Sequence, residues 1–203
     1  MSPRLLAIAD EVKNDSIVLD VGTDHAYLPI FLVQNHICPK VIASDISKSA
    51  LEGAKTNIEK RKINNITLVL SDGLKDIHEN YDTLIISGMG SRTIIKILEG
   101  QVLPDKIILS SQSDVHLLRS YMNKLGYRLI KEKFVLDGGK YYSIITYHKG
   151  KEKLSKSDLL YGKSINKAYY KYLYDKKKEI SKKVGLLKKI KLNRELKELE
   201  KRL

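Results

Sequence analysis

Three aspartates stand at or just after the ends of successive apolar runs: Asp20, Asp45 and Asp72. If these runs are parallel strands of one sheet, their carboxyl ends meet at a single edge, which is where ligands bind in open α/β sheets. There Asp45 could accept hydrogen bonds from ribose hydroxyls, and Asp72 from the amino group of an adenine. The pattern therefore predicts a crevice for a ligand that contains a nucleoside.

The loop after the first run narrows the choice of ligand. Small residues at Gly22 and Ala26 allow a sharp turn and a close approach of the backbone to a bound molecule. A nicotinamide dinucleotide would need G-x-G-x-x-G around its pyrophosphate, but Asp24 occupies the place of the second glycine. A carboxylate is unfavourable beside a pyrophosphate and tolerable beside a sulfonium, so we expect S-adenosylmethionine.

Five apolar runs must position these residues. Because the runs are continuous rather than alternating, they predict strands that are buried on both faces. Helical patterns lie between the runs: one follows the first run and ends near Asn35, and a second spans residues 47–61. Strands that alternate with helices in this way are typical of a parallel doubly wound sheet. The predicted strands are residues 16–21, 40–45, 66–70, 83–87 and 106–110.

The pattern changes after the fifth run. A helix over 115–125 is stopped by Gly126, and two strand-like runs, 128–136 and 140–148, follow it. The short link of 137–139 cannot hold a crossover, so the pair must be an antiparallel hairpin. The predicted fold class is α/β: a Rossmann-like methyltransferase sheet of parallel strands plus a terminal antiparallel hairpin, an assignment by fold analogy.

Charge divides the chain into two parts. Residues 1–150 have a net charge of +2, whereas residues 151–203 carry +11 of the total +13. We expect a ligand-binding domain over 1–150 and a basic α-helical, coiled-coil-like domain over 151–203 that binds a polyanion such as RNA. After a polar hinge over 151–158, apolar residues at helical spacing predict two helices with a turn between Val184 and Asn193.

Two segments resemble a known family. Residues 20–29 (DVGTDHAYLP) and 86–90 (ISGMG) are similar to the hallmark motifs of bacterial tRNA (adenine-N1)-methyltransferases that act on adenine 22, the TrmK family. The resemblance extends over the whole chain and implies S-adenosylmethionine as cofactor and tRNA as substrate. Two positions depart from the family pattern: the loop 110–113 (SSQS) replaces an expected Gln-Pro, and Ser91 replaces a glycine.

The resemblance also implies roles for individual residues. The floor beside the sulfonium would be formed by Ser87, Gly88 and Met89, and the target base would stack on Tyr27, which directly follows the cofactor loop. These four residues are the candidate catalytic residues. The implied cofactor-binding residues are Asp20, Gly22, Thr23, Asp24, His25, Ala26, Asp45, Ile46, Asp72, Gly73, Ser87, Gly88 and Met89. Transfer of an activated methyl group to adenine N1 is an in-line displacement in which positioning should dominate.

Other features limit the function classes. One Cys and five scattered His argue against a zinc site, so we expect no metal, and no run is long enough for a membrane span. A lone Cys and no signal peptide fit a cytoplasmic protein. We expect it to be a monomer. Two alternatives stay open: a methyltransferase acting on a small molecule or protein, and a non-catalytic RNA-binding protein on a methyltransferase scaffold.

Overall fold

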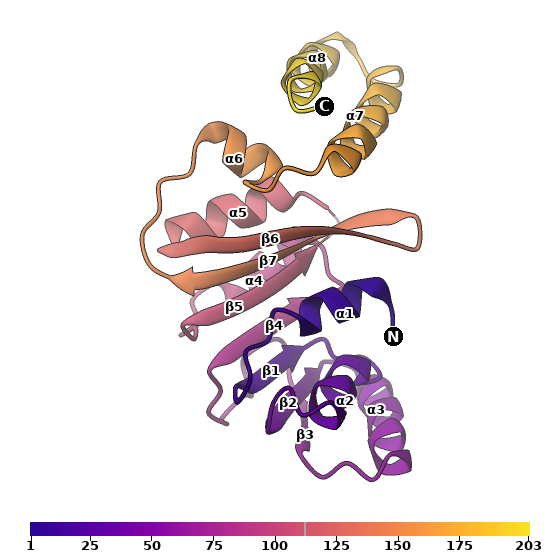
Figure 1. Ribbon diagram of the computed structural model, residues 1–203, viewed down its shortest axis with the longest axis vertical. Helices are drawn as coiled ribbons and strands as arrows, with labels where there is room; N and C mark the ends of the chain where they lie inside the picture. The colour runs from indigo at the N-terminus through magenta and orange to yellow at the C-terminus, as the bar shows by residue number, and fades with distance from the viewer. Residues whose placement is uncertain (112) are drawn as a thin grey trace. The chain divides into compact units, whose positions relative to one another are not determined.

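The computed structural model describes residues 1–111 and 113–203, and its contacts divide the chain into two compact units, Met1–Gly162 and Lys163–Leu203. The first unit is built on a seven-stranded sheet in the order β3-β2-β1-β4-β5-β7-β6 (Figure 1). Its strands are β1 (Ile17–Val21), β2 (Lys40–Asp45), β3 (Ile66–Leu70), β4 (Thr83–Ser87), β5 (Lys106–Ser111), β6 (Tyr127–Asp137) and β7 (Lys140–Lys149). All five predicted parallel strands are therefore confirmed.

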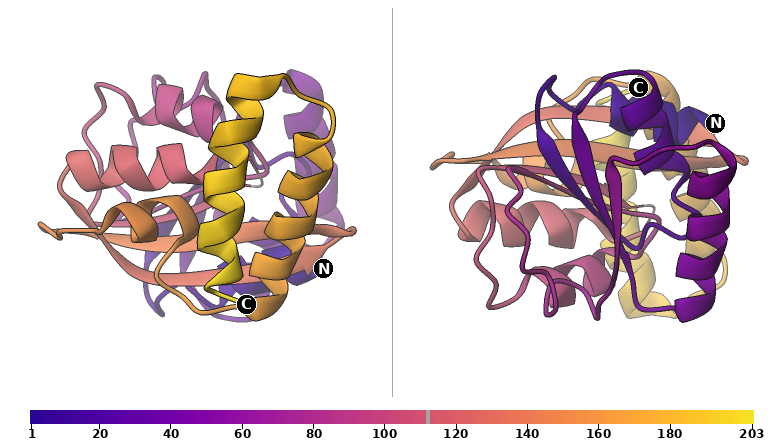
Figure 2. Two further views of the ribbon diagram at one scale, coloured as in Figure 1. Left: turned by 90° about the horizontal axis from the view of Figure 1, so that it is seen from above. Right: turned by 90° about the horizontal axis from the view of Figure 1, so that it is seen from below.

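Helices cover both faces of this sheet. Val18, Ile85 and Ile108 pack on one face against α1 and α2, whereas Leu19 and Leu84 pack on the other against α4 and α5. Figure 2 shows the two groups of helices on opposite sides of the strands. The helices of this unit are α1 (Pro3–Ala9), α2 (Tyr27–Gln34), α3 (Lys48–Lys60), α4 (Ser91–Leu98), α5 (Val115–Lys124) and α6 (Lys156–Tyr161).

The predicted antiparallel hairpin is confirmed as β6 and β7. Asp137 pairs with Lys140, and the two residues between them, Gly138 and Gly139, have φ values of 55° and 74°. Two consecutive positive φ values are those of a type I′ turn, which matches the twist of the flanking strands. β7 also pairs antiparallel with β5, so the hairpin completes the mixed sheet.

The boundary between the units falls after Gly162, later than the expected boundary after residue 150. Residues 151–162, which include the expected hinge, form hydrogen bonds with the rest of the first unit. Leu129 N donates to Glu152 Oε2 (2.9 Å), and Asn123 Nδ2 donates to the Glu152 carbonyl (2.8 Å). Arg119 Nη1 donates to the Leu159 carbonyl (3.1 Å), which holds α6 as well.

The second unit consists of two helices, α7 (Lys167–Ser181) and α8 (Leu186–Glu200), joined at residues 182–185. They run side by side in opposite directions (Figure 2, left). The Asn166 side chain caps α7 by accepting from Tyr169 N (2.8 Å). An ion pair between Lys177 and Glu195 (2.6 Å) links the two helices. The turn begins slightly before the predicted interval.

Candidate active site

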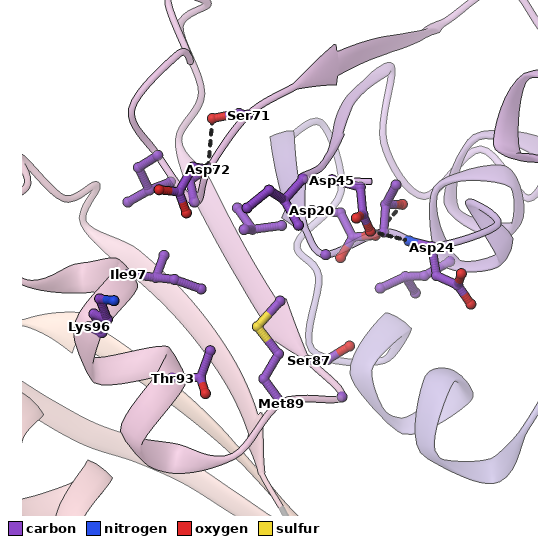
Figure 3. A pocket seen from close by; sticks show the side chains of 18 of the residues that line it. Asp20, Asp24, Asp45, Ser71, Asp72, Ser87, Met89, Thr93, Lys96 and Ile97 are labelled. Atoms are coloured by element: carbon purple, nitrogen blue, oxygen red, sulfur yellow. Dashed lines mark hydrogen bonds between the residues drawn. The ribbon is translucent and has the colours of Figure 1, made fainter. Parts of the chain in front are cut away.

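A cavity of about 690 Å³ opens at the carboxyl ends of β1, β2 and β4 and beside the loop after β3. This volume is typical of a site for a nucleoside-sized ligand. Figure 3 shows Met89 pointing into it between Asp20 and Asp45 on one side and Ile97 on the other. Its lining residues are Arg4, Leu5, Asp20, Val21, Gly22, Thr23, Asp24, Tyr27, Leu28, Asp45, Ile46, Ser71, Asp72, Gly73, Leu74, Lys75, Ser87, Gly88, Met89, Thr93, Lys96, Ile97, Gln101 and Tyr142.

The loop after β1 is fixed to the neighbouring strand. Gly22 N and Thr23 N both donate to the Ser44 carbonyl of β2 (2.8 and 2.9 Å). Gly22 has a φ of +73°, and a Cβ there would lie 2.2 Å from Met89 Cε. Any larger residue would therefore be strained and would push Met89 aside. The predicted need for a small residue at position 22 thus has a specific steric cause.

Asp20 is a buried carboxylate in the cavity wall. Burial raises its pKa to about 6, against a lowering effect of the hydrogen bond that Thr23 Oγ1 donates to its Oδ2 (2.8 Å). The negative charge of Asp45 raises the pKa further, and the positive charge of Arg4 lowers it. Keeping this group charged at neutral pH costs stability, which is typical of a functional carboxylate.

This cost gives a first prediction, for the Asp20→Asn variant. The folded state holds the Asp20 proton up to about pH 6, whereas the unfolded chain releases it near 3.8. The carboxylate therefore destabilises the fold progressively as the pH rises from 4 to 6, by about 3 kcal/mol in full. Urea unfolding at several pH values should show the variant gaining stability over the native protein across that window. A constant difference would contradict the assignment.

Asp45 is held in place by the backbone around it. Its Oδ2 accepts from Asp24 N (3.0 Å) and its Oδ1 from Ser47 N (2.9 Å). Each carboxylate oxygen has a further lone pair, so the group can still accept hydrogen bonds from a ligand. The Asp45 carboxylate is thus held in one orientation at the end of β2, beside the exposed side chain of Ile46.

Asp72 and Gly73 form the opposite wall. The Asp72 carboxylate is paired with Lys75 at 2.5 Å, and this pairing lowers its pKa. A Cβ at Gly73, whose φ is +69°, would lie 3.2 Å from the Ile97 side chain. The glycine therefore lets the loop after β3 approach α4. The Asp72 carboxylate can accept a hydrogen bond, and the aliphatic side chain of Ile97 lies beside it. This combination suits adenine, which is a flat ring with polar groups at its edge.

The structure does not bring every predicted residue into the cavity. His25 and Ala26 do not line it. A Cβ at Gly53 of α3 would lie 2.5 Å from His25 Nδ1, so the imidazole packs on α3 instead. Ala26 has a φ of +56° and is fully buried at the start of α2. Tyr27, next in sequence, does line the cavity and is 50% exposed.

Several cavity residues were missed by sequence reasoning. Arg4 comes from α1, Thr93, Lys96 and Ile97 from α4, and Tyr142 from β7. None of these residues directly follows a parallel strand. A search for polar residues at the ends of predicted strands therefore could not identify them. Only the helical period of α4 could have placed residues 93, 96 and 97 on one face.

The two departures from the family pattern contact each other. Ser91 Oγ donates to Ser111 Oγ (3.1 Å) and to the Ser113 carbonyl (2.6 Å). A serine at position 91 therefore ties the start of α4 to the loop after β5. Gln112, part of the same predicted loop, lies outside the described residues.

The residues present fit S-adenosylmethionine. The cavity offers Asp45 and Asp72 as acceptors for ribose and adenine, and it keeps the buried Asp20 near the loop of Gly22. Arg4 Nε is buried beside the same cavity without a hydrogen-bond partner. Over the described residues we find neither a cluster of metal-binding side chains nor a helix long and apolar enough to cross a membrane.

Comparisons with known proteins agree with this geometry. A family described as "Methyltransferase domain" matches residues 1–145. The tRNA (adenine(22)-N(1))-methyltransferase of Bacillus subtilis is 34% identical over 156 residues, which are 74% of this chain and 66% of that protein.

Solved structures extend the likeness to the whole chain. The TrmK of M. capricolum, solved with the cofactor product S-adenosylhomocysteine, has a TM-score of 0.89 at 29% identity, and the match covers 99% of this chain and 96% of that one. The B. subtilis tRNA methyltransferase TrmK has a TM-score of 0.86 at 25% identity and covers 100% and 98%. The chain therefore belongs to the methyltransferase-domain family and, within it, to the tRNA (adenine(22)-N1)-methyltransferase group.

Proposed function

We propose that the protein transfers the methyl group of S-adenosylmethionine to N1 of adenine 22 in tRNA. The observation that carries this proposal is the cavity at the carboxyl edge of the sheet, where Asp45 and Asp72 face a nucleoside-sized volume. The likeness to tRNA (adenine(22)-N1)-methyltransferases supplies the substrate. When bound, the cofactor supplies a sulfonium that activates its methyl group for direct displacement.

The chain's residues would bind and orient the reactants. Asp45 accepts from the ribose hydroxyls and Asp72 from the adenine amino group, while Ile46 and Ile97 contact the ring. Ser87 ends β4, Gly88 and Met89 follow it, and all three line the cavity, where they would form the floor beside the sulfonium. Adenine N1 carries a lone pair and no proton, so the transfer itself needs no general base. Alignment of the two reactants is therefore the main task of the site.

The second unit would hold the tRNA. Lys163–Leu203 contains 15 Lys and Arg against five Asp and Glu. Phosphate neutralisation by such residues supplies much of the affinity for nucleic acids. We propose that α7 and α8 pack as a short coiled coil that presents these cations, and that the protein acts as a monomer in the cytoplasm.

Methyl transfer to tRNA tests the proposal directly. The protein is incubated with labelled S-adenosylmethionine and unmodified tRNA, and the modified position is mapped by primer extension, which N1-methyladenine blocks. We expect one stop at position 22, and none in a tRNA with guanine there. Label in a protein or small molecule, or RNA binding without any transfer, would favour one of the alternative functions.

Tyr27 gives a second prediction, because it is half exposed at the cavity mouth. Stacking of a base on an aromatic ring contributes about 1–3 kcal/mol, so Tyr27→Ala should lower methyl transfer by about 5- to 150-fold. Tyr27→Phe keeps the ring and should retain most activity. Single-turnover transfer rates and S-adenosylhomocysteine affinity are measured for both variants. A Phe variant as slow as the Ala variant would exclude the stacking role.

A further inference from the structure

A buried ion pair lies against the last residues of the first unit. Arg119 of α5 donates to Glu132 Oε1 of β6 through Nε (3.0 Å) and Nη2 (2.6 Å), and both side chains are almost fully covered. Ser143 Oγ of β7 donates to the same oxygen (2.6 Å). The pair therefore joins one helix to both strands of the hairpin. None of these three residues lines the cofactor cavity.

Another donor group of Arg119 holds the end of α6. Its Nη1 donates to the carbonyls of Leu159 (3.1 Å) and Leu160 (3.2 Å), which lie in the last turn of that helix. The last carbonyls of a helix have no partners within it, so a cation at this place caps the helix. The start of α6 is closed by a capping box of Ser155 and Asp158. A helix of six residues is too short to be stable alone, so it depends on these contacts.

Gly162, which follows α6, passes directly over the ion pair. Its N donates to the Asp158 carbonyl (2.8 Å). Its φ is +87°, and a Cβ at this position would collide with Glu132 Oε2. Only glycine fits both the backbone conformation and the space. The last residue of the first unit is therefore fixed against a buried carboxylate.

The second unit begins with an anchor of its own. Ser164 stands two positions after Gly162, and its carbonyl accepts from the hydroxyl of Tyr170 in α7 (2.5 Å). Arg202 Nη1 in turn donates to the same hydroxyl oxygen (3.0 Å). Lys163 is therefore the single residue between a position held by the first unit and a position held by the second.

Stability alone does not explain a buried ion pair at this place. Replacing such a pair by well-packed apolar residues is often neutral or stabilising, because two charges must be removed from water to form it. What the guanidinium adds is direction. Its planar donors reach the Glu132 carboxylate and the two α6 carbonyls at once, and that geometry allows one arrangement of the three elements.

Resting on the proposed function, we propose that Arg119 and Glu132 are positioning residues for methyl transfer. They fix the point at which the tRNA-holding second unit starts, so that the bound tRNA presents its target adenine to the cavity. Neither residue touches the reactants. Their effect is on the effective concentration and alignment of the adenine, which a short and fixed link raises.

Two full-length variants remove this fixed link in different ways. The first combines Arg119→Met with Glu132→Gln, which removes both charges together and leaves no unpaired charge buried. Its amide oxygen can still accept from Ser143 Oγ, but the carbonyls of α6 lose their cap. The second variant inserts Gly-Gly-Ser between Gly162 and Lys163 and leaves the ion pair intact.

A matched control carries the same insertion elsewhere in the first unit. Gly-Gly-Ser is placed between Asn64 and Asn65, two exposed residues in the loop before β3 that do not line the cavity. β3 and β6 are the two opposite edges of the sheet, so this insertion leaves the ion pair and α6 untouched.

We expect both variants to bind S-adenosylhomocysteine and unmodified tRNA within about threefold of the native protein, measured by calorimetry and filter binding. Single-turnover methyl transfer at saturating concentrations of S-adenosylmethionine and tRNA should fall by about tenfold or more, because a loosely held adenine is rarely aligned with the methyl group. A variant that combines both changes should be no slower than the slower of the two, since each removes the same constraint. The control insertion should leave the rate unchanged.

A native transfer rate in either variant would overturn the inference. Losses that multiply in the combined variant would also overturn it, because they would show that the ion pair supports the fold of the first unit independently of the link. If the ion-pair variant binds no S-adenosylhomocysteine, the rate of the Gly162 insertion variant decides alone. Methyl transfer to tRNA by the native protein supports the proposed function whatever the variants show, and its absence refutes both.

Discussion

Asp45→Ala should weaken the binding of S-adenosylhomocysteine by at least about tenfold. Each hydrogen bond between a ribose hydroxyl and a carboxylate contributes about 1.5–3 kcal/mol. The effect should exceed that single loss, because the same carboxylate holds Asp24 N at 3.0 Å and Ser47 N at 2.9 Å. Removing it both deletes an acceptor and loosens the loop that surrounds the cofactor.

Asp45→Asn separates these two contributions. The amide oxygen can still accept one of the two backbone hydrogen bonds, but the charge is lost, so an intermediate affinity is expected. Asp76→Ala serves as the matched control, since Asp76 is an exposed aspartate four positions from Asp72 that does not line the cavity. Calorimetric affinity for the Ala variant equal to that of the control would refute the ribose-binding role.

The sheet was predictable because its central strands are buried on both faces. Ile85, Ile108 and Leu109 belong to continuous apolar runs, and all three are fully buried. Hydrophobic burial is a local signal that sequence patterns carry directly. The hairpin was equally clear, since two adjacent glycines between apolar runs specify a tight turn.

The site was predictable only where residues follow parallel strands. Asp45 and Asp72 reach the cavity because strand ends share one edge of the sheet. The orientation of His25 was not predictable in this way. Positive φ values at Asp24 (53°) and Ala26 (56°) turn the chain so that the imidazole faces Gly53 of α3. Such a turn depends on the packing of α3, which no local pattern describes.

Buried charged residues were also not predictable from local sequence patterns. Arg119 and Glu132 look like surface residues in the sequence, yet their side chains are 1% and 0% exposed and form an ion pair at 2.6 Å. Arg119 also bonds to carbonyls of α6, so the segment after residue 150 is part of the first unit. Charge and composition cannot distinguish a polar segment that packs on a domain from one that links two domains.

Neutralising part of the second unit should sharply reduce tRNA binding. The tested variant is the full chain with Lys183, Lys188, Lys189 and Lys191 replaced by Gln, four exposed lysines close to the turn between α7 and α8. Each phosphate contact that is lost should reduce the slope of log affinity against log salt by about 0.7–0.9. Four contacts would lower the slope by about 3 and the affinity by several orders of magnitude at low salt.

The control variant replaces lysines whose charge is already paired with a carboxylate. Lys171, Lys182 and Lys201 are paired with Asp175, Glu179 and Glu198 on their own helices at 2.6–3.1 Å. Replacing these three by Gln should reduce the salt slope less, because their charge is already partly compensated. Affinity for S-adenosylhomocysteine should be unchanged in both variants, since all cofactor-cavity residues precede Gly162. Equal salt slopes for the four-lysine variant and the native protein would show that this end of the helical hairpin does not bind tRNA.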